Sequence, residues 1–186
     1  MKLIRLSILT GFLISATFMV EATPLLAACE QIKSYTFDDE SYKDWEPHDE
    51  GGSISLSDGF SGKAAKIQRI CTDEDDFTAL ELNLPMAVWA RQIIRIDAMI
   101  KGDNIGDKPQ HNNAGYINIE AMTTSHGPKN PTDWGHFHGT FDWKAVSYKW
   151  KIPDDAQKVM IRIGLQGVTG IIYLDNIRIY RCTELE

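Results

Sequence analysis

The sequence predicts an all-β protein, a two-sheet antiparallel β-sandwich of the jelly-roll kind, from three observations. Short runs rich in β-branched and aromatic residues are separated by Gly, Pro, Asn and Asp clusters throughout the chain after Cys29. Several of these runs alternate apolar and polar residues with a period of two, as strands with one buried face do. No run of ordinary helical length shows a clear 3.6-residue pattern.

About nine strands are expected, close to an eight-stranded jelly roll with one strand added. The alternation is clearest where Ile94 and Ile96 point to one face and Arg95 and Asp97 to the other. Two such sheets bury one apolar face each and leave polar outer faces. The expected strands span residues 31–38, 52–57, 63–71, 77–83, 92–101, 115–123, 144–152, 157–166 and 170–181.

The first part of the chain has the pattern of an export signal. Lys2 and Arg5 give a basic start, and residues 6–20 are almost wholly apolar before small alanines that suit cleavage. We therefore expect residues 1–28 to be a signal peptide, with a lipoprotein signal as a variant, and residues 29–186 to be one domain. The expected location is secreted or periplasmic, or lipid-anchored at the cell envelope.

Charge and composition exclude some partners. The chain has 186 residues, a formal net charge of −7 and a sequence pI of about 5.2. No basic stripe is present to neutralise phosphates, so a nucleic-acid partner is not expected. The same charge argues against the domain itself resting on an anionic membrane, which leaves a Cys29 lipid as the route to one.

The three cysteines allow two arrangements. Residues 26–29, Leu-Ala-Ala-Cys, match a bacterial lipobox, in which Cys29 carries lipid and Cys71 and Cys182 are free or paired. Alternatively, Cys29 joins Cys182 in a disulfide that staples the two chain ends, and Cys71 is left over.

A register argument supports the disulfide. Residues paired in antiparallel strands have a constant sum of residue numbers. If the first and last strands are neighbours, Cys29 with Cys182 and Asp38 with Asp175 have nearly equal sums. The sequence leaves the lipid and the disulfide as open alternatives.

Four stretches, in order, resemble the jelly-roll carbohydrate-binding modules of families four, nine and twenty-two, whose fold is a galactose-binding-like β-sandwich. They are residues 35–39 with Trp45, residues 59–67, residues 141–146 with Ile152 and Pro153, and residues 163–179. The resemblance implies an exported, non-catalytic protein that holds a poly- or oligosaccharide in a shallow cleft, in association with glycan-active enzymes. It also implies a structural calcium between the first and last strands. The acidic pair of the family's last strand is here Asp175-Asn176, which leaves one carboxylate.

Asp175 is notable without the resemblance. In a regular strand it shares a face with Ile171, Tyr173, Ile177 and Ile179, which we expect to point inward. A carboxylate inside a sandwich must be paired, hydrogen-bonded or bound to a cation, and extracellular Ca²⁺ prefers oxygen ligands. The resemblance carries this calcium role onto Asp38 and Asp175, with a backbone carbonyl near Lys63 as a further ligand. The alternative is that Asp175 only accepts backbone N–H bonds.

Polar residues on the outer positions of several strands are candidates for sugar binding. Planar amide, carboxylate and guanidinium groups hydrogen-bond sugar hydroxyls in pairs, and nearby rings stack on pyranose faces. The alternative is an ordinary solvated sheet face. The candidates are Arg95, Asn118, Glu120, Arg162 and Gln166, with Asp97 beside them, and the rings of Trp45, Tyr116 and Trp134. Trp134 lies in a long Gly/Pro/His loop, whereas Trp143 and Trp150 are expected in the core.

Two further clusters are weaker. His136 and His138 alternate along an extended segment, but a zinc or copper site needs a third ligand and supporting groups. The acidic run at residues 73–76 lacks the glycine and spacing of a recognised calcium loop, so we interpret it as a charged turn.

Two other functions compete with glycan binding. Glu120 and Asp97 facing each other across neighbouring strands would give the carboxylate pair of a small glycosidase or lyase. No nucleophile elbow, His-Cys signature or phosphate-binding loop is present. The second is an envelope or cell-surface protein that uses the sandwich to contact another protein.

Overall fold

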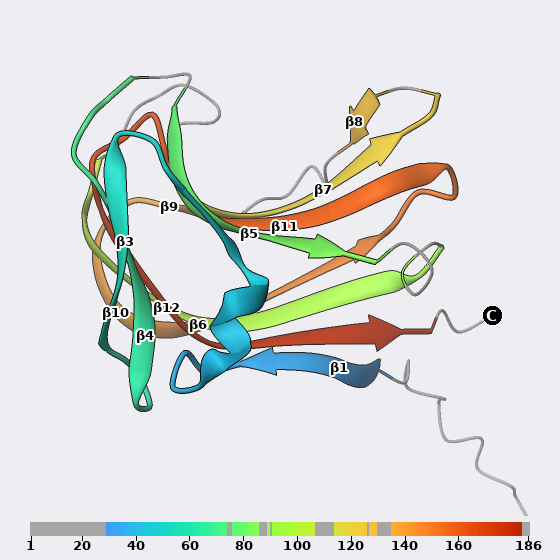
Figure 1. Cartoon of the computed structure of the whole chain (residues 1–186), viewed down its shortest axis with the longest axis horizontal. Helices are drawn as coiled ribbons and strands as arrows, with labels where there is room; N and C mark the ends of the chain where they lie inside the picture. The colour runs from blue at the N-terminus through green and yellow to red at the C-terminus, as the bar shows by residue number, and fades with distance from the viewer. Residues whose placement is uncertain are drawn as a thin grey trace, which may run out of the picture.

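The computed structural model describes residues 29–73, 76–85, 89, 91–106, 114–125, 127–129 and 135–183, and Figure 1 shows their arrangement. The described residues form two antiparallel sheets of six strands each, which confirms the predicted sandwich. None of the described residues belong to a helix with the length and apolar character needed to span a membrane.

Sheet A has the strand order β10-β6-β12-β4-β3, with β1 also paired to β12. Its strands are β1 (Cys29–Tyr35), β3 (Gly52–Asp58), β4 (Lys63–Arg69), β6 (Ile93–Ile105), β10 (Gly139–Lys151) and β12 (Gly170–Cys182).

Sheet B has the order β2-β5-β11-β7-β8, with β9 also paired to β7. Its strands are β2 (Glu46–Asp49), β5 (Phe77–Leu84), β7 (Ala114–Thr123), β8 (Gly127–Lys129), β9 (Gly135–Phe137) and β11 (Ala156–Gln166). A short 3₁₀ helix, η1 (Glu40–Asp44), leads into β2.

The nine predicted strands all have counterparts, but β2, β8 and β9 were not predicted. Each is only three or four residues long, and β2 and β8 contain Pro47 and Pro128. A strand this short shows no measurable alternation, and proline argues against a strand in the sequence alone. All three lie at or near the margins of sheet B, where proline is tolerated.

The core fills the space between the sheets, and both sheets bend in the same sense. Sheet A lies on the convex side and sheet B on the concave side, so the backbone of sheet B curves away from the core along its strands (Figure 1). The isoleucines of β6, β7 and β11 alternate inward as predicted, because a period of two brings them all to one face. The fully buried ones include Ile94, Ile96, Ile100, Ile161 and Ile163.

Strand β12 departs from the regular alternation that the sequence predicts. Ile172 and Leu174 point inward before residue 175, and Ile177 and Ile179 point inward after it. The pairing with β6 shifts between Asp175 and Arg178, where Asn176 adopts a left-handed φ of 50°. Asn is one of the few non-glycine residues that tolerate this conformation. The prediction that Ile171 and Tyr173 share the inward face was therefore wrong, because the bulge reverses the alternation.

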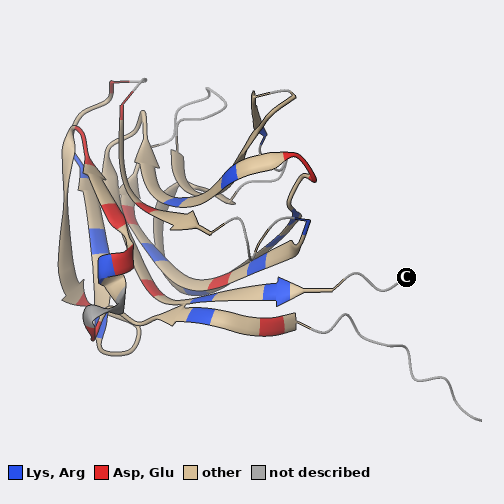
Figure 2. Ribbon diagram, turned by 45° about the vertical axis from the view of Figure 1, so that its right-hand side comes forward, with Lys and Arg blue, Asp and Glu red and all other residues tan. Residues whose placement is uncertain are grey.

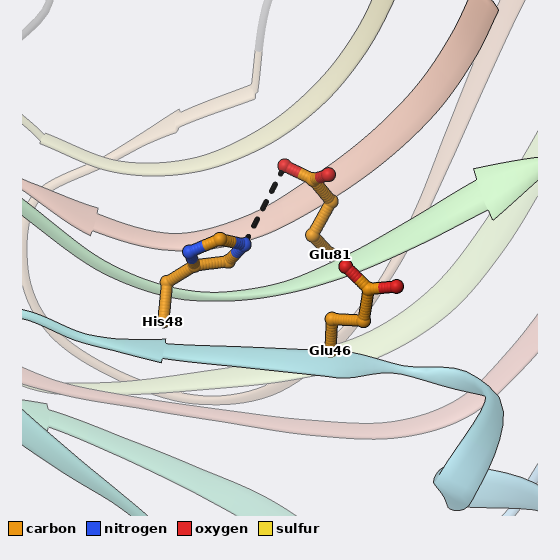
Figure 3. Close-up of side chains that lie close together, drawn as sticks. All are labelled: Glu46, His48 and Glu81. Carbon is orange, nitrogen blue, oxygen red and sulfur yellow. Dashed lines mark ion pairs between the residues drawn. The ribbon is translucent and has the colours of Figure 1, made fainter.

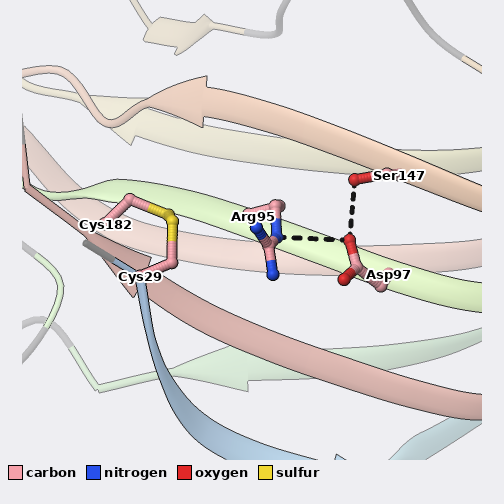
Figure 4. The surroundings of a disulfide bond; sticks show 5 residues. All are labelled: Cys29, Arg95, Asp97, Ser147 and Cys182. Atoms are coloured by element: carbon pink, nitrogen blue, oxygen red, sulfur yellow. Dashed lines mark hydrogen bonds and ion pairs between the residues drawn. A yellow bond between two sulfur atoms is a disulfide. The ribbon is translucent and has the colours of Figure 1, made fainter. Parts of the chain in front are cut away.

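The two ends of the described chain lie side by side. Strand β1 pairs with the second half of β12, from Cys29 opposite Cys182 to Tyr35 opposite Ile177, with one bulge between Gln31 and Lys33. A disulfide joins Cys29 to Cys182 (Figure 4). A thioether to lipid would need the same sulfur atom, so Cys29 in this disulfide cannot also carry a lipid. Cys71 is a free, half-buried thiol.

Removing this disulfide should destabilise the domain. A cross-link that closes a loop of about 150 residues restricts the unfolded chain, so Cys29→Ala with Cys182→Ala should lower the free energy of unfolding by about 2 to 5 kcal/mol. Urea unfolding of the purified chain measures this. Cys71→Ser is the matched control and should change stability much less. Equal stabilities with and without reductant would contradict the expectation.

Candidate functional site

The outer face of sheet B brings polar residues from four strands into two adjacent cross-strand rows. The first row runs from Glu46 on β2 through Glu81 and Arg162 to Asn118 on β7. The second row runs from His48 through Ala79 and Gly164 to Tyr116. This second row has large side chains at its ends and almost none in its middle.

Arg162 lies at the centre of this face. Its Nε and Nη2 donate to Oε2 of buried Glu81 at 3.2 and 2.8 Å, and its Nη1 lies 3.9 Å from Oε2 of Glu120. Because Ala79 and Gly164 have little or no side chain, the guanidinium also reaches the Phe77 ring, 4.6 Å from the ring centroid. The guanidinium is therefore held in one orientation and still partly exposed to solvent.

Three buried polar atoms around Arg162 have no hydrogen-bond partner among the described residues. They are His48 Nε2, Tyr116 Oη and Asn118 Oδ1. Trp45 Nε1, Arg69 Nε and Arg95 Nε share this property but lie elsewhere. An unpartnered buried polar atom costs about 1 to 3 kcal/mol, so such atoms normally meet water or a ligand. Burial raises the pKa of Tyr116 well above its ordinary range, so its hydroxyl stays protonated and can donate.

Glu46, His48 and Glu81 form a cluster with ligand atoms close enough to share a metal ion (Figure 3). Glu81 is already surrounded by cations, since Arg162 lies 2.8 Å from it and the Lys158 ammonium lies 3.8 Å from its other oxygen. These positive charges repel a metal ion and compete for the same oxygens. His48 Nε2 lies 3.7 Å from Glu81, beyond hydrogen-bonding distance. The cluster is therefore better suited to hold Arg162 than a metal.

The structure brings together only part of the predicted glycan-binding set. Tyr116, Asn118, Glu120, Arg162 and Gln166 lie on the outer positions of β7 and β11 in sheet B.

Arg95 and Asp97 lie on β6 in sheet A, on the opposite side of the core, where Asp97 accepts a 2.6 Å hydrogen bond from Ser147 (Figure 4). The prediction that Arg95 shares a cleft with Asn118 was wrong. Alternation shows that a residue points outward but not from which sheet. For the same reason Glu120 and Asp97 cannot be a catalytic pair.

The tryptophans also divide. Trp45 is 4% exposed and packs edge-on against Tyr35 in the core, so it offers no stacking face on the outer surface. Trp134 lies outside the described residues. Trp143, expected in the core, is half-buried on the outer side of sheet A beside Tyr173, because β10 shifts register between Phe141 and Lys144. Trp150 packs against the core as expected.

Sequence reasoning missed His48, Phe77 and Glu81. Phe77 and Glu81 occupy alternate positions of a correctly predicted strand. The period-two pattern of that strand could therefore have identified both as outward-facing residues. His48 belongs to the short strand β2, which carries no such pattern. Their common role follows only from the cross-strand pairing with β11.

The two carboxylates predicted to bind calcium lie at a single turn. Asp175, fully buried, accepts hydrogen bonds from the backbone N–H groups of Ser61 and Asn176 at 2.9 and 2.6 Å. Asp38 accepts one from the N–H of Lys63 at 2.7 Å. Among the described residues neither carboxylate has an ion pair with Lys or Arg.

Two glycines leave room for these carboxylates. A Cβ at Gly59 would lie 2.8 Å from Asp175 Oδ2 and 2.9 Å from the Lys63 carbonyl oxygen, and one at Gly62 would lie 2.3 Å from Asp38 Oδ1. The Asp175 carboxylate and the Lys63 carbonyl thus lie against Gly59 and the Asp38 carboxylate against Gly62, and these are oxygen ligands of the kind that a hard cation takes. The donor set fits Ca²⁺.

The electrostatics agree with this fit. Burial is the largest cause that raises the pKa of Asp175 above its ordinary value of 3.8. The hydrogen bonds from backbone N–H groups oppose the rise, and the negative charge of Asp38 adds to it. A carboxylate whose ionisation is disfavoured by burial and by a neighbouring negative charge is a place where a cation lowers the energy.

The fold of this chain is similar to those of several solved carbohydrate-binding modules. A family 22 xylan-binding domain of Paenibacillus barcinonensis Xyn10C matches with a TM-score of 0.60 and 11% identity, over 86% of this chain and 98% of that one. The C-terminal family 22 module of Clostridium thermocellum Xyn10B, studied for the role of its cleft in ligand binding, matches with a TM-score of 0.62 and 13% identity. That match covers 84% of this chain and 96% of the other. The chain has the fold of a carbohydrate-binding module.

A family 4 carbohydrate-binding module shares this fold with a TM-score of 0.51 and 18% identity, over 80% of this chain and 94% of that module. No protein-family model matches the sequence, and no curated protein is detectably similar to it. The jelly-roll resemblance seen in the sequence is therefore confirmed at the level of the fold.

The raised pKa of Asp175 predicts a pH dependence of stability in chelator. Its folded pKa lies above the unfolded value, so the stability that protonation contributes is present below that unfolded value and is lost as pH rises through the folded pKa. The free energy of unfolding should thus fall, relative to that of Asp175→Asn, as pH rises from about 4 through the raised pKa of Asp175. Urea unfolding of both proteins across this range measures the difference. A difference that grows with pH would contradict the expectation.

Proposed function

We propose that this chain is a non-catalytic, exported glycan-binding protein, whose ligand lies on the outer face of sheet B. The observation that carries the proposal is the set of unpartnered polar atoms, His48 Nε2, Tyr116 Oη and Asn118 Oδ1, around the oriented guanidinium of Arg162. The shared fold with xylan-binding family 22 domains supports the same ligand class.

Sugar hydroxyls match this site chemically. Each hydroxyl donates one hydrogen bond and accepts others, so one sugar can donate to Asn118 Oδ1 and accept from the Tyr116 hydroxyl. Arg162 adds a planar donor whose orientation is already set by Glu81, so little conformational entropy is lost on binding. His48 and Tyr116 are three strand spacings apart, about 14 Å, which spans a short oligosaccharide. The ligand class we propose is a poly- or oligosaccharide held in a shallow cleft.

The carboxylates of the site are engaged by a cation, which supports a binding role. Both carboxylates nearest its centre, Glu81 and Glu120, face the same guanidinium, with Arg162 2.8 Å from the first and 3.9 Å from the second. Glycoside hydrolysis instead needs one carboxylic acid to protonate the leaving group and a second carboxylate to attack the sugar or activate water. We therefore place this chain among binders, and reducing-sugar release from any glycan would show otherwise.

Calcium is the second part of the proposal. Asp38, Asp175 and the Lys63 carbonyl would hold the ion, which would neutralise the two carboxylates and tie the end of β1 to β12 and to the turn before β4. Its role there would be structural, since this turn is built by sheet A and the Arg162 site by sheet B.

Substitutions in the glycan site should weaken glycan binding without changing stability. Tyr116→Phe and Asn118→Ala each remove an unpartnered atom, so each should weaken retention on insoluble xylan by about fivefold to tenfold without lowering the melting temperature. Depletion binding and thermal melts of the same samples measure both. Tyr180→Phe, on the outer face of sheet A, is the matched control.

The outcomes are distinct. Loss of stability in both variants would mean that the two atoms are structural and not ligand-facing. Retention of the unmodified chain on no member of a glycan panel would move the assignment to an envelope protein that contacts another protein.

Calcium should raise the melting temperature of the unmodified chain relative to chelator. At about one hundred times the dissociation constant, the ion adds about 2.7 kcal/mol of stability. The shift should vanish in Asp175→Asn and shrink on acidification, because the ligands must be deprotonated. Asp58→Asn is the control, since Asp58 is exposed at the same hairpin and pairs only with Lys63. Identical melts in calcium and chelator would remove the metal from the proposal.

A further inference from the structure

The outer face of sheet A is positively charged, although the chain has a net charge of −7. It is formed by the outward positions of β6 and their partners on β10, β12 and β4, and Figure 2 shows Lys and Arg in blue along several of these strands. Its exposed and half-exposed charged residues are six basic and two acidic ones: Lys66, Arg95, Lys101, Lys149, Lys151, Arg178, Asp97 and Asp103.

Most of these cations are not neutralised by the protein. Lys66, Lys149 and Arg178 have no ion pair and no side-chain hydrogen bond with any described residue. Lys101 makes a cation–π contact, 5.8 Å from the centroid of the Tyr173 ring. Arg95 forms an ion pair with Asp97 at 3.3 Å, and Arg178 is the cross-strand partner of the same residue without an ion pair to it. The face thus presents a field that attracts anions.

Three aromatic rings lie close together on the same face. Trp143 is at the centre, 6.2 Å from Phe60 and 6.3 Å from Tyr173 between ring centroids, and Phe60 is 54% exposed. Phe60 belongs to the turn that Asp175 anchors through the N–H of Ser61, so its exposed position is set by the fold. Lys66 and Lys101 are the cross-strand partners of Tyr173, which places cations beside the rings.

A pocket of about 470 Å³ lies next to these rings, with Phe60 in its lining. Phe60, Asp97, Ser147, Asn176 and Arg178 contribute to its lining. Ser147 donates a 2.6 Å hydrogen bond to Asp97 and so fixes the orientation of its carboxylate. The remaining lone pairs of this carboxylate can accept hydrogen bonds from the hydroxyls of a ligand. The pocket therefore combines one free guanidinium with hydroxyl-binding groups.

We propose that this face is a second glycan-binding surface, specific for an anionic polysaccharide that carries uronic acid carboxylates. A uronate ring has an apolar CH face that suits Trp143 and a carboxylate that suits Lys66, Lys101 and Arg178. This surface goes beyond the site around Arg162, since it lies on the other sheet and shares no residue with it. A polyphosphate fits this face less well, because it has few hydroxyls and no apolar ring face for Trp143.

Affinity electrophoresis of the purified chain through gels containing polygalacturonate tests the surface, with xylan gels run in parallel. The unmodified chain should be retarded by polygalacturonate, and retardation should decrease between about 50 mM and about 300 mM salt. Trp143→Ala and the pair Lys66→Glu with Lys101→Glu should each weaken this binding about tenfold and leave xylan binding unchanged. Phe60→Ala, at an exposed position, should also weaken it and covers the case in which Trp143→Ala does not fold.

Controls separate this surface from general charge and from the sheet B site. Lys129→Glu, on β8 of sheet B, makes half of that charge change elsewhere and should leave polygalacturonate binding intact. Tyr116→Phe should weaken xylan binding alone, so each site can fail without the other. No retardation at low salt, equal loss in Lys129→Glu, or tighter Trp143-dependent binding to poly-dT than to polygalacturonate would overturn the proposal.

Discussion

The structure depends on a change of partner in the middle of β12. This strand pairs with β6 along most of its length, but on its other side it pairs with β4 up to Leu174 and with β1 from Ile177 onward. At the junction the ladder is interrupted, and the backbone N–H of Asn176 needs an acceptor, as does that of Ser61 in the turn before β4. The buried Asp175 carboxylate accepts hydrogen bonds from both. One side chain thereby joins the last strand to the turn before β4.

Burying the ionised carboxylate of Asp175 is energetically unfavourable, and this cost explains the chemistry around it. A buried carboxylate close to Asp38 is less stable when ionised, as the raised pKa of Asp175 shows. Gly59 and Gly62 keep the space next to both carboxylates free of side chains. A divalent cation is the simplest way to recover the lost energy, so the metal proposal follows from the partner change in β12 and not from an isolated acidic pair.

The two outer faces use charge differently. On sheet B, Arg162 is held by Glu81 and supported by Phe77, so its charge is compensated and its direction is set. That arrangement suits neutral hydroxyls, for which orientation matters more than field strength. On sheet A, Lys66 and Arg178 are uncompensated and lie near exposed rings. That arrangement suits an anionic ligand, because attraction is strongest where no protein carboxylate competes.

The sequence by itself determined the fold class, the nine longer strands and the inward side of β6, β7 and β11, because a period of two is a local property of the chain. It also indicated Asp38 with Asp175 and Cys29 with Cys182 as neighbours, since antiparallel pairing of the ends relates residue numbers. Only the tertiary structure decided which sheet each outward residue belongs to. It places Arg95 and Asn118 on different sheets and buries Trp45 in the core. It also assembled Glu81, Arg162 and Phe77, because strand order and register depend on pairing between distant segments, which alternation along one strand does not encode.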